Sequence, residues 1–229
     1  MPHPTVLLFD LDGTLVRTGG AGRRAMRRAL AAELDAPDAL AGVSFGGRTD
    51  RWILRTAFTR VGRAFDEAGF ARVTATYLGF LEDELREPEG YRVLPAVPEV
   101  VSACAAVAAV AVGLGTGNIE PAAYAKLGPS GLASSFGFGG FGSDAEDRAE
   151  LVSTGFARGA AQLGAKPEDV RRVIIGDTAR DVDAAKATGA LCLAVGTGGE
   201  DPAVLAERGA DLAVDTLADP RALPFLVGP

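Results

Sequence analysis

Residues 5–14 read Thr-Val-Leu-Leu-Phe-Asp-Leu-Asp-Gly-Thr, and this stretch decides the fold of the 229-residue chain. Its first five residues are apolar or β-branched, which is typical of a strand buried on both faces of a parallel sheet, and the run stops at Asp10. Similar runs occupy residues 107–114, 173–175 and 191–195, each followed by a turn that contains glycine. We therefore predict four buried strands that end in short turns.

Segments of helical character lie between these strands, at residues 146–163 and 179–188, and Gly189 closes the second. This alternation predicts an α/β fold, a Rossmann-like doubly wound parallel sheet with helices on both faces. Residues 100–119 carry no charge and are long enough to suggest a membrane span, but Ala, Gly, Ser and Thr dominate them. We interpret this stretch as a buried helix that runs into a buried strand.

Residues 17–91 break the alternation, because apolar positions recur at helical spacing and no strand is evident. A parallel crossover needs only about a dozen residues, so this segment is too long for a simple connection. We predict a helical cap domain at residues 17–93, inserted after the first strand. Residues 1–16 and 94–229 are then expected to form the α/β catalytic core.

The composition argues against several classes of function. With 23 basic and 30 acidic residues, the net charge is −7, so no overall positive field favours nucleic acid as a partner. The single histidine, His3, argues against histidine-based catalysis and histidine-built zinc sites. Cys104 and Cys192 lie in apolar runs and are expected to be buried free thiols. No secretory signal is visible, and we expect a cytoplasmic protein without a membrane partner. Nothing in the sequence indicates the oligomeric state.

Carboxylates gather where the predicted strands end. Asp10 and Asp12 follow the first strand, and Asp177 and Asp181 follow the strand at residues 173–175. Because ligands bind at the carboxyl ends of parallel strands, we expect these side chains to converge. Two like charges about 4 Å apart repel by about 4 kcal/mol at an effective dielectric constant of ~20. The cluster therefore needs protons or a cation, and oxygen ligands without His or Cys select Mg²⁺.

A small-residue turn, Thr116-Gly117-Asn118, follows the strand at residues 107–114. Its backbone N–H groups can approach a phosphate closely, and its hydroxyl and amide can donate further hydrogen bonds. Since Mg²⁺ commonly binds a substrate phosphate oxygen as well as carboxylates, the turn and the carboxylates together point to phosphate chemistry.

Three motifs carry a resemblance to a known family: residues 10–15 (Asp-Leu-Asp-Gly-Thr-Leu), Thr116, and residues 176–182 (Gly-Asp-Thr-Ala-Arg-Asp-Val). They resemble motifs I, II and IV of the haloacid dehalogenase (HAD) superfamily. With the helical insertion, the pattern is similar to the phosphoglycolate phosphatase-like branch with a C1 cap. The resemblance covers essentially the whole chain.

The resemblance implies a role for each matching residue. Asp10 would be the nucleophile that forms an aspartyl-phosphate, and Asp12 the general acid and base. Mg²⁺ would be held by Asp10, the backbone carbonyl of Asp12 and Asp177, with Asp181 in a supporting position. Thr116 would bond the phosphoryl oxygens, and the residues expected to help it are Gly117 and Asn118.

Motif III departs from the family pattern, which has a lysine there. The matching segment, residues 142–148, places Arg148 at that position, and arginine can grip phosphate bidentately. The alternative is that Arg148 only pairs with Asp144 or Asp147 on its own helix. Lys126 is the second candidate for this cation, its alternative being a solvated helix surface.

Residues 17–63 hold ten arginines and four acidic residues. This excess of positive charge is either a solvated face of ion pairs or a funnel for a phosphorylated metabolite. Residues 46–50 (Gly-Gly-Arg-Thr-Asp) resemble the cap loop that faces the active site in the family, which makes Arg48 a candidate substrate contact. Trp52 is expected to belong to the core of the cap.

Together these features predict a Mg²⁺-dependent phosphatase that hydrolyses a small phosphorylated metabolite, a phosphomonoester, through an aspartyl-phosphate on Asp10. A phosphomutase of the same family would return the phosphoryl group to its substrate instead of to water. A non-catalytic protein that binds a phosphate ligand is the alternative from another class, although it would not need an acid two residues from a nucleophile. The sequence does not identify the phosphomonoester.

Overall fold

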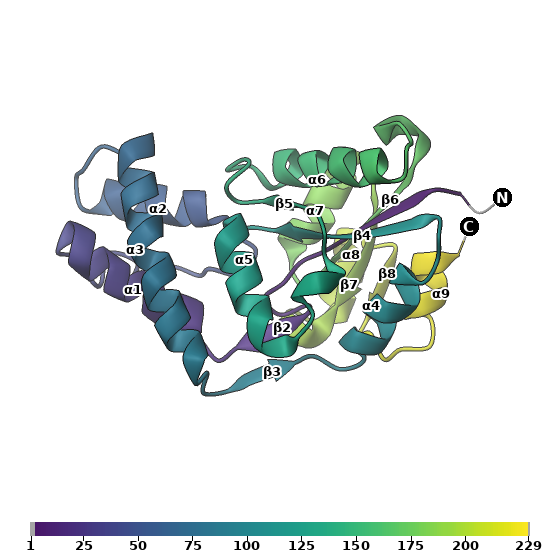
Figure 1. Cartoon of the computed structure of the whole chain (residues 1–229), viewed down its shortest axis with the longest axis horizontal. Helices are drawn as coiled ribbons and strands as arrows, with labels where there is room; N and C mark the ends of the chain where they lie inside the picture. Colours follow the sequence, from purple (N-terminus) through teal and green to yellow (C-terminus); the bar gives the residue numbers. More distant parts are fainter. Residues whose placement is uncertain (1–2, 229) are drawn as a thin grey trace.

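A six-stranded parallel sheet forms the centre of the molecule, in the computed structural model, which describes residues 3–228 (Figure 1). The strand order is β5-β4-β1-β6-β7-β8. The bounds of the strands are β1 Thr5–Phe9, β4 Val110–Thr116, β5 Gly139–Phe141, β6 Arg171–Gly176, β7 Leu191–Val195 and β8 Leu212–Val214. The predicted α/β fold with a parallel sheet is therefore confirmed.

All five residues of β1 are buried, because β1 is central and pairs with β4 on one side and β6 on the other. The predicted strands at residues 5–9 and 191–195 have the observed bounds. The strand predicted at 107–114 begins later, at Val110, and ends at Thr116. The strands β5 and β8 were not predicted, since three residues are too few to show an apolar pattern.

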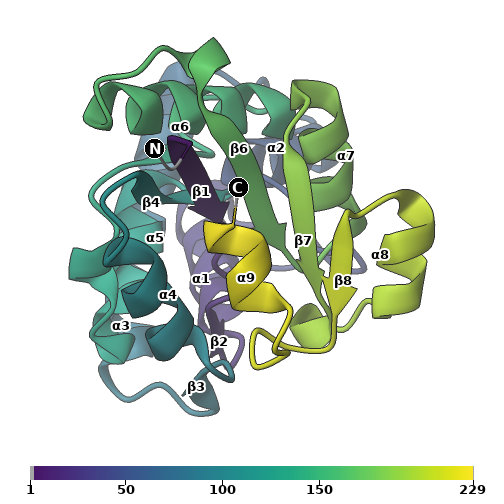
Figure 2. The same cartoon turned by 90° about the vertical axis from the view of Figure 1, so that its right-hand side faces the viewer.

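Helices cover both faces of the sheet (Figure 2). The side chains of Leu7 and Phe9 pack against α4 and α9, whereas Val6 and Leu8 pack against α6 and α7. The bounds of these helices and their neighbours are α4 Val97–Ala105, α5 Glu120–Leu127, α6 Arg148–Gln162, α7 Ala179–Thr188, α8 Pro202–Arg208 and α9 Ala222–Val227. Alternate residues of one strand thus supply two separate hydrophobic cores.

The predicted helix at 179–188 is confirmed, and Gly189 ends it in the left-handed conformation that glycine adopts readily. The uncharged segment 100–119 is a helix, α4, followed by the buried strand β4, as predicted. No helix among residues 3–228 is long and apolar enough to cross a membrane. Cys104 and Cys192 are buried free thiols, as expected.

Three of the four helices between β1 and β4 form a separate layer at one end of the molecule (Figure 1): α1 (Ala21–Leu34), α2 (Asp50–Arg60) and α3 (Glu67–Arg86). They enclose a hydrophobic core of their own, in which Met26, Leu54 and Tyr77 are fully buried. We call residues 21–86 the helical insert. It lies beyond the carboxyl ends of the sheet strands and packs α3 against α5.

The expectation of no strand in residues 17–91 is wrong at both ends of this segment. Strand β2 (Val16–Thr18) pairs antiparallel with β3 (Tyr91–Val93), so that the chain enters and leaves the helical insert through neighbouring backbone. Arg17 lies opposite Arg92 in this pair. Three-residue strands with a charged centre show no apolar periodicity, which explains why the sequence did not indicate them.

Candidate active site

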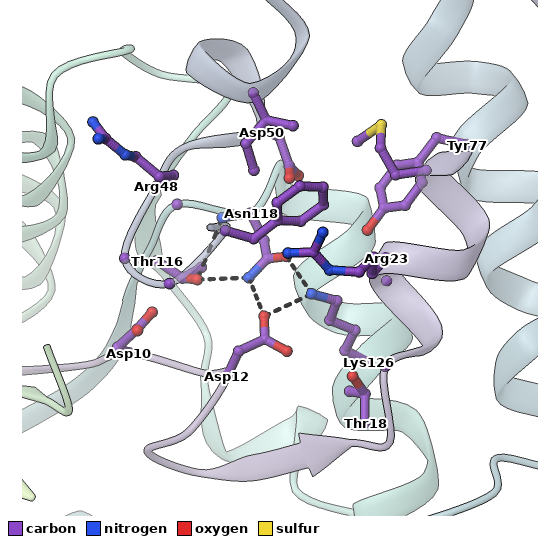
Figure 3. Close-up of a pocket in the computed structure, with 18 of the residues that line it drawn as sticks. Asp10, Asp12, Thr18, Arg23, Arg48, Asp50, Tyr77, Thr116, Asn118 and Lys126 are labelled. Carbon is purple, nitrogen blue, oxygen red and sulfur yellow. Dashed lines mark hydrogen bonds and ion pairs between the residues drawn. The ribbon is translucent and has the colours of Figure 1, made fainter. Parts of the chain in front are cut away.

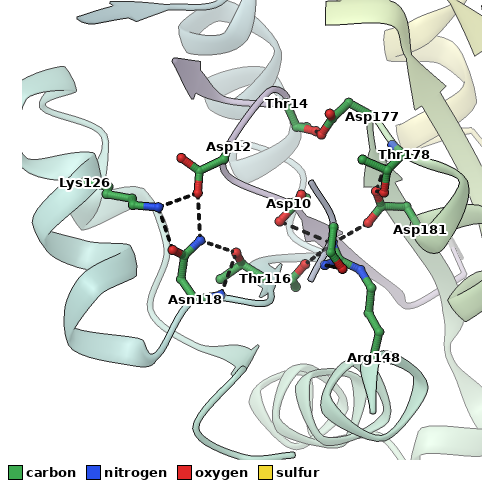
Figure 4. A network of polar contacts seen from close by, with 12 residues as sticks. Asp10, Asp12, Thr14, Thr116, Asn118, Lys126, Arg148, Asp177, Thr178 and Asp181 are labelled. Atoms are coloured by element: carbon green, nitrogen blue, oxygen red, sulfur yellow. Dashed lines mark hydrogen bonds and ion pairs between the residues drawn. The ribbon is translucent and has the colours of Figure 1, made fainter. Parts of the chain in front are cut away.

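Three buried carboxylates meet at the carboxyl end of the sheet. Asp10 follows β1, Asp177 follows β6, and Asp181 lies in the first turn of α7. Strands β1 and β6 are parallel neighbours in which Phe9 lies opposite Ile175, so the residues that follow them share one edge. One oxygen atom of each carboxylate lies within 4.8 Å of the others (Figure 4).

The electrostatics of this cluster favour a bound cation. Burial raises the pKa of Asp10 to about 6; the charge of Asp181 adds to the rise and that of Arg148 opposes it. The pKa of Asp177 lies well above its ordinary value because of burial and then because of the charges of Asp10 and Asp181. Negative charge is therefore unfavourable here without a further positive charge, and an all-oxygen site of this kind suits Mg²⁺. The donor set thus fits a divalent ion.

The three carboxylates differ in how many of their oxygens already accept hydrogen bonds. Both oxygens of Asp181 are engaged, one by Arg148 and the other by the backbone N–H and hydroxyl of Thr178. Asp177 accepts one hydrogen bond, from the hydroxyl of Thr14 at 2.9 Å. Asp10 and Asp177 therefore keep oxygens that could bind an ion, while Asp181 holds its neighbours in place.

Arg148 begins α6, and its side chain is buried between the carboxylates rather than on its own helix. Its Nη2 lies 3.3 Å from Asp10 Oδ1 and also contacts Asp181. Burial works against its charge, but the attraction of Asp181 and Asp10 outweighs burial and raises the pKa of Arg148. Of the expected alternative partners, Asp144 instead pairs with Arg158, and Asp147 caps α6.

A second polar network joins the motif II turn to α5 (Figure 4). The amide nitrogen of Asn118 donates to Thr116 Oγ1 at 2.8 Å and to Asp12 Oδ2 at 2.9 Å. Lys126 Nζ donates to Asp12 Oδ2 at 2.6 Å and to Asn118 Oδ1 at 2.7 Å. Lys126 is buried, so it does not lie on a solvated helix surface. Asp12 thus directs its carboxylate toward this network and away from the three-carboxylate cluster.

The loop at residues 45–50 docks the helical insert onto the core. A Cβ atom on Gly117 would lie 2.2 Å from the carbonyl oxygen of Arg48, so only glycine permits this approach. The backbone N–H of Asp50 donates to the carbonyl of Gly117 at 2.7 Å, and the Thr49 hydroxyl donates to the Glu146 carbonyl at 3.0 Å.

The side chain of Arg48 stacks on Trp52, with its guanidinium carbon 3.8 Å from the ring centroid. Burial, and then the charge of Arg180, lower its pKa. Figure 3 shows this side chain directed away from Asp12. The structure thus brings the backbone of Arg48 to the motif II turn and leaves its guanidinium on the opposite side of the loop.

The ten arginines of residues 17–63 have different kinds of partner. Five of the ten in residues 17–63 form ion pairs with carboxylates, four of them exposed and Arg51 half-buried: Arg24, Arg27, Arg28, Arg51 and Arg55. Arg23 instead donates to the carbonyl of Val43 and covers the ring of Phe45 at 4.1 Å. For the five paired arginines, the solvated-face interpretation accounts for the charge.

A cavity of about 190 Å³ lies between the insert and the core, with Asp10, Asp12 and Thr116 on its core side (Figure 3). Its insert side carries three residues with charged or hydrogen-bonding side chains that were not predicted: Arg23, Asp50 and Tyr77. Asp50 is the last residue of the motif-like loop at 46–50, which was the only signal that could have indicated it. Tyr77 follows the apolar stripe of α3 and carries no separate signal. The cavity is smaller than the roughly 300–1,000 Å³ typical of drug-sized ligands.

The fold and this site define a hydrolase family. The sequence model of the haloacid dehalogenase-like hydrolases matches residues 4–189, and the chain belongs to that family. This confirms the HAD resemblance that the three motifs indicate. No curated protein matches the chain.

Solved structures share the fold over nearly the whole chain. A hydrolase from Pseudomonas syringae has a TM-score of 0.61 and 21% identity, covering 97% of this chain and 96% of its own. A predicted phosphoglycolate phosphatase from Haemophilus somnus has a TM-score of 0.64 and 18% identity, covering 95% and 96%. CbbY from Rhodobacter sphaeroides, in complex with phosphate, has a TM-score of 0.64 and 19% identity, covering 96% of each chain. At these identities the similarity concerns the fold.

Proposed function

We propose that this hydrolase is a Mg²⁺-dependent phosphatase that cleaves a small phosphomonoester through an aspartyl-phosphate on Asp10. The observation that carries the proposal is the position of Asp10. Its carboxylate lies in the buried cluster with Asp177 and Asp181 and also borders the cavity. A carboxylate in this place can meet both a cation and the phosphorus atom of a substrate.

The residues of the chain divide the reaction between them. Asp10 attacks phosphorus, and the bond from phosphorus to the ester oxygen breaks, while Asp12 gives its proton to that oxygen. The Asp12 carboxylate then takes a proton from water, whose oxygen attacks the phosphorus of the aspartyl-phosphate and releases Asp10 and inorganic phosphate. The hydroxyl of Thr116 and the guanidinium of Arg148 hold the phosphoryl oxygens. Asp10, Asp177 and the carbonyl of Asp12 would hold Mg²⁺, which neutralises charge on the phosphoryl group.

The helical insert acts in this proposal as a cap over the site. It closes the cavity from the side opposite to the sheet and excludes water from the aspartyl-phosphate. Because the cavity is about 190 Å³, the substrate is a compact metabolite rather than a protein or a polymer. The similar structures include a predicted phosphoglycolate phosphatase and a complex with phosphate, in keeping with this class of substrate.

The test is release of inorganic phosphate from a panel of small phosphomonoesters. We expect turnover by the wild-type protein with Mg²⁺ and none with EDTA. We expect Asp10→Asn to lower kcat by at least about a thousandfold, because the nucleophile is lost. Full activity of that variant, or in EDTA, contradicts the proposal. Conversion of a phosphorylated substrate into an isomer without phosphate release indicates a mutase instead.

A further inference from the structure

Two residues on the insert side of the cavity keep a polar atom that no protein group meets within residues 3–228: the Tyr77 hydroxyl and one oxygen of the Asp50 carboxylate. Tyr77 is 1% exposed, and its hydroxyl takes part in no hydrogen bond. Asp50 is 6% exposed; one carboxylate oxygen accepts from the backbone N–H of Ile119 at 2.8 Å, and the other accepts nothing. Both residues line the cavity, and Figure 3 shows both groups directed into it. Neither atom is enclosed by protein, so both open onto the cavity, where a polar group of a ligand can meet them.

The fold places Asp50 and Tyr77 close to the groups that would react. Asp50 begins α2 and is tied to the motif II turn through its own N–H and through Ile119. Tyr77 lies on α3, and its hydroxyl lies beside Gly22 of α1. A Cβ atom at Gly22 would lie 3.6 Å from the Tyr77 hydroxyl and 3.1 Å from Lys126 Nζ. The pair therefore faces the side of the cavity where Asp12 would protonate the leaving group.

The hydrogen-bonding chemistry of Asp50 and Tyr77 favours a ligand that carries a hydroxyl group. The Asp50 carboxylate accepts hydrogen bonds, and burial raises the pKa of Tyr77 well above its ordinary value, so its phenol remains a donor. A hydroxyl group can donate to the first and accept from the second at once. A carboxylate can only accept, so it leaves the Asp50 oxygen without a donor, and the repulsion by Asp50 and Asp12 offsets the attraction of Lys126 and Arg23. An ammonium can only donate and faces the cations Lys126 and Arg23.

We propose that Asp50 and Tyr77 form a specificity subsite for a hydroxyl group on the leaving alcohol, so that short polyol phosphates are preferred over carboxylate-bearing phosphoesters. This inference rests on the proposed phosphatase function and names its substrate class. The remaining wall of the cavity suits a short carbon chain, since Met26, Phe45 and Ile53 line it. The small volume limits that chain to a few carbon atoms.

Three phosphoesters of similar size test the wild-type protein with Mg²⁺. Glycerol 3-phosphate carries hydroxyls, propyl phosphate carries none, and phosphoglycolate carries a carboxylate. We expect kcat/KM for glycerol 3-phosphate to exceed that for each of the others by at least about tenfold, because an unmet buried acceptor and donor penalise both. Equal values, or a preference for phosphoglycolate, overturn the inference.

Two conservative variants assign the preference to these residues. Tyr77→Phe should lower the ratio of kcat/KM between glycerol 3-phosphate and propyl phosphate about tenfold. Asp50→Asn can still accept from Ile119 but presents an N–H₂ donor to the cavity, so it should shift the ratio of phosphoglycolate to glycerol 3-phosphate upward about tenfold. Tyr124→Phe is the matched control, because the Tyr124 hydroxyl donates to the Phe136 carbonyl, away from the cavity. Unchanged ratios in the first two variants overturn the inference.

The outcomes separate this inference from the function on which it rests. If no phosphoester yields phosphate with Mg²⁺, the proposed function fails, and the subsite proposal fails with it. If all three are hydrolysed without preference, phosphatase function stands and only the subsite proposal is overturned. Preference for the hydroxylated ester, lost in Tyr77→Phe and retained in Tyr124→Phe, supports both.

Discussion

The guanidinium of Arg148 lies 3.3 Å from the carboxylate of Asp10, although the two residues are 138 positions apart in the chain and both side chains are buried. The same guanidinium contacts Asp181 and the carbonyls of Gly47 and Gly115. One planar cation thus joins the end of β1, the end of β4, α7 and the loop of the helical insert. Replacing it should therefore change catalysis and stability together.

Arg148→Lys keeps the charge but provides one ammonium in place of a five-donor fork. We expect kcat/KM to fall about a hundredfold and stability to fall by about 1–3 kcal/mol, since buried acceptors lose donors. Steady-state kinetics and urea unfolding measure the two effects. Arg158→Lys is the control, because Arg158 forms a half-exposed pair with Asp144 whose contribution is below about 1 kcal/mol. Similar behaviour of the two variants contradicts the assignment.

Asp10→Asn should make the metal-free protein more stable while it removes activity. The pKa of Asp10 is raised from 3.8 to about 6, chiefly by burial, so its ionised form costs about 3 kcal/mol at neutral pH. A neutral amide avoids this cost, and the melting temperature in EDTA at pH 7.5 should rise by several degrees. Glu168→Gln, on the exposed surface, should change it by less than about a degree. A melting temperature that falls in Asp10→Asn contradicts the expected cost of keeping Asp10 ionised in the folded protein.

The same raised pKa gives a pH dependence of defined sign. Between pH 3.8 and about 6 the folded protein holds a proton on Asp10 that the unfolded chain has lost. The stabilisation that comes from holding this proton on Asp10 is therefore complete below pH 3.8 and is lost as the pH rises through about 6. The stability advantage of Asp10→Asn over wild type should be near zero at pH 4 and full at pH 7.5. Thermal unfolding of both proteins in EDTA across this range measures it, and a constant difference would count against the prediction.

Mg²⁺ should stabilise the wild-type protein more at pH 7.5 than at pH 5, because protons compete with the ion for the same carboxylates. The shift in melting temperature on adding Mg²⁺, compared at the two pH values, measures this competition. Asp10→Asn, which removes one expected ligand, should show a smaller shift at pH 7.5. An equal shift in melting temperature in both proteins would show that Asp10 does not bind Mg²⁺.

Lys126→Met distinguishes the roles of the two buried cations. Lys126 contacts Asp12 and Asn118, whereas Arg148 contacts Asp10. Without its ammonium, Asp12 is no longer held, so an alkyl phosphate, which needs protonation of its leaving oxygen, should lose about a hundredfold in kcat. Acetyl phosphate, whose leaving acetate needs no proton, should lose less than about tenfold. Equal losses of kcat for the two substrates would indicate that Lys126 acts on the phosphoryl group and not on the leaving group. Lys186→Met, on the exposed side of α7, is the control.

Gly117→Ala tests the docking of the insert. Its Cβ would meet the carbonyl oxygen of Arg48 at 2.2 Å and Cα of Thr49 at 3.0 Å, so the loop must move away. We expect kcat/KM to fall at least about tenfold, because Asp50 moves with the loop. Gly79→Ala provides the contrast: this exposed position in α3 has open space for a Cβ, and stability should rise by roughly 0.5–1 kcal/mol with unchanged kinetics. Unaltered kinetics in Gly117→Ala would show that docking does not limit activity.

The sequence predicts the cluster at the sheet edge because each of its members stands at a position defined by a pattern. Asp10 comes directly after a buried apolar run, Asp177 comes one glycine after another, and Asp181 follows at a helical spacing. Parallel strands place their ends on one edge whatever their order, so convergence does not require the strand order to be known. The family match then confirms the class of protein, whereas the roles of the individual residues stay predictions.

Side chains that reach the site from helices are much harder to predict. Lysine on a helix is normally exposed, yet Lys126 is buried, because Asp12 and Asn118 come to it from other segments. Asp50 stands among charged residues and Tyr77 among apolar ones, so local patterns give each an ordinary interpretation. Their meeting depends on how α2 and α3 pack, and one sequence carries no record of such distant contacts.

The antiparallel pairing of β2 with β3 has a consequence for how such proteins diversify. Val16 lies opposite Val93, and the Leu94 N–H donates to the Leu15 carbonyl at 3.0 Å, so both ends of the insert are anchored at one point. A segment attached in this way can be exchanged for another, by recombination or by design, without altering the register of the central sheet. The site residues at the sheet edge and those of the helical insert can therefore be inherited separately.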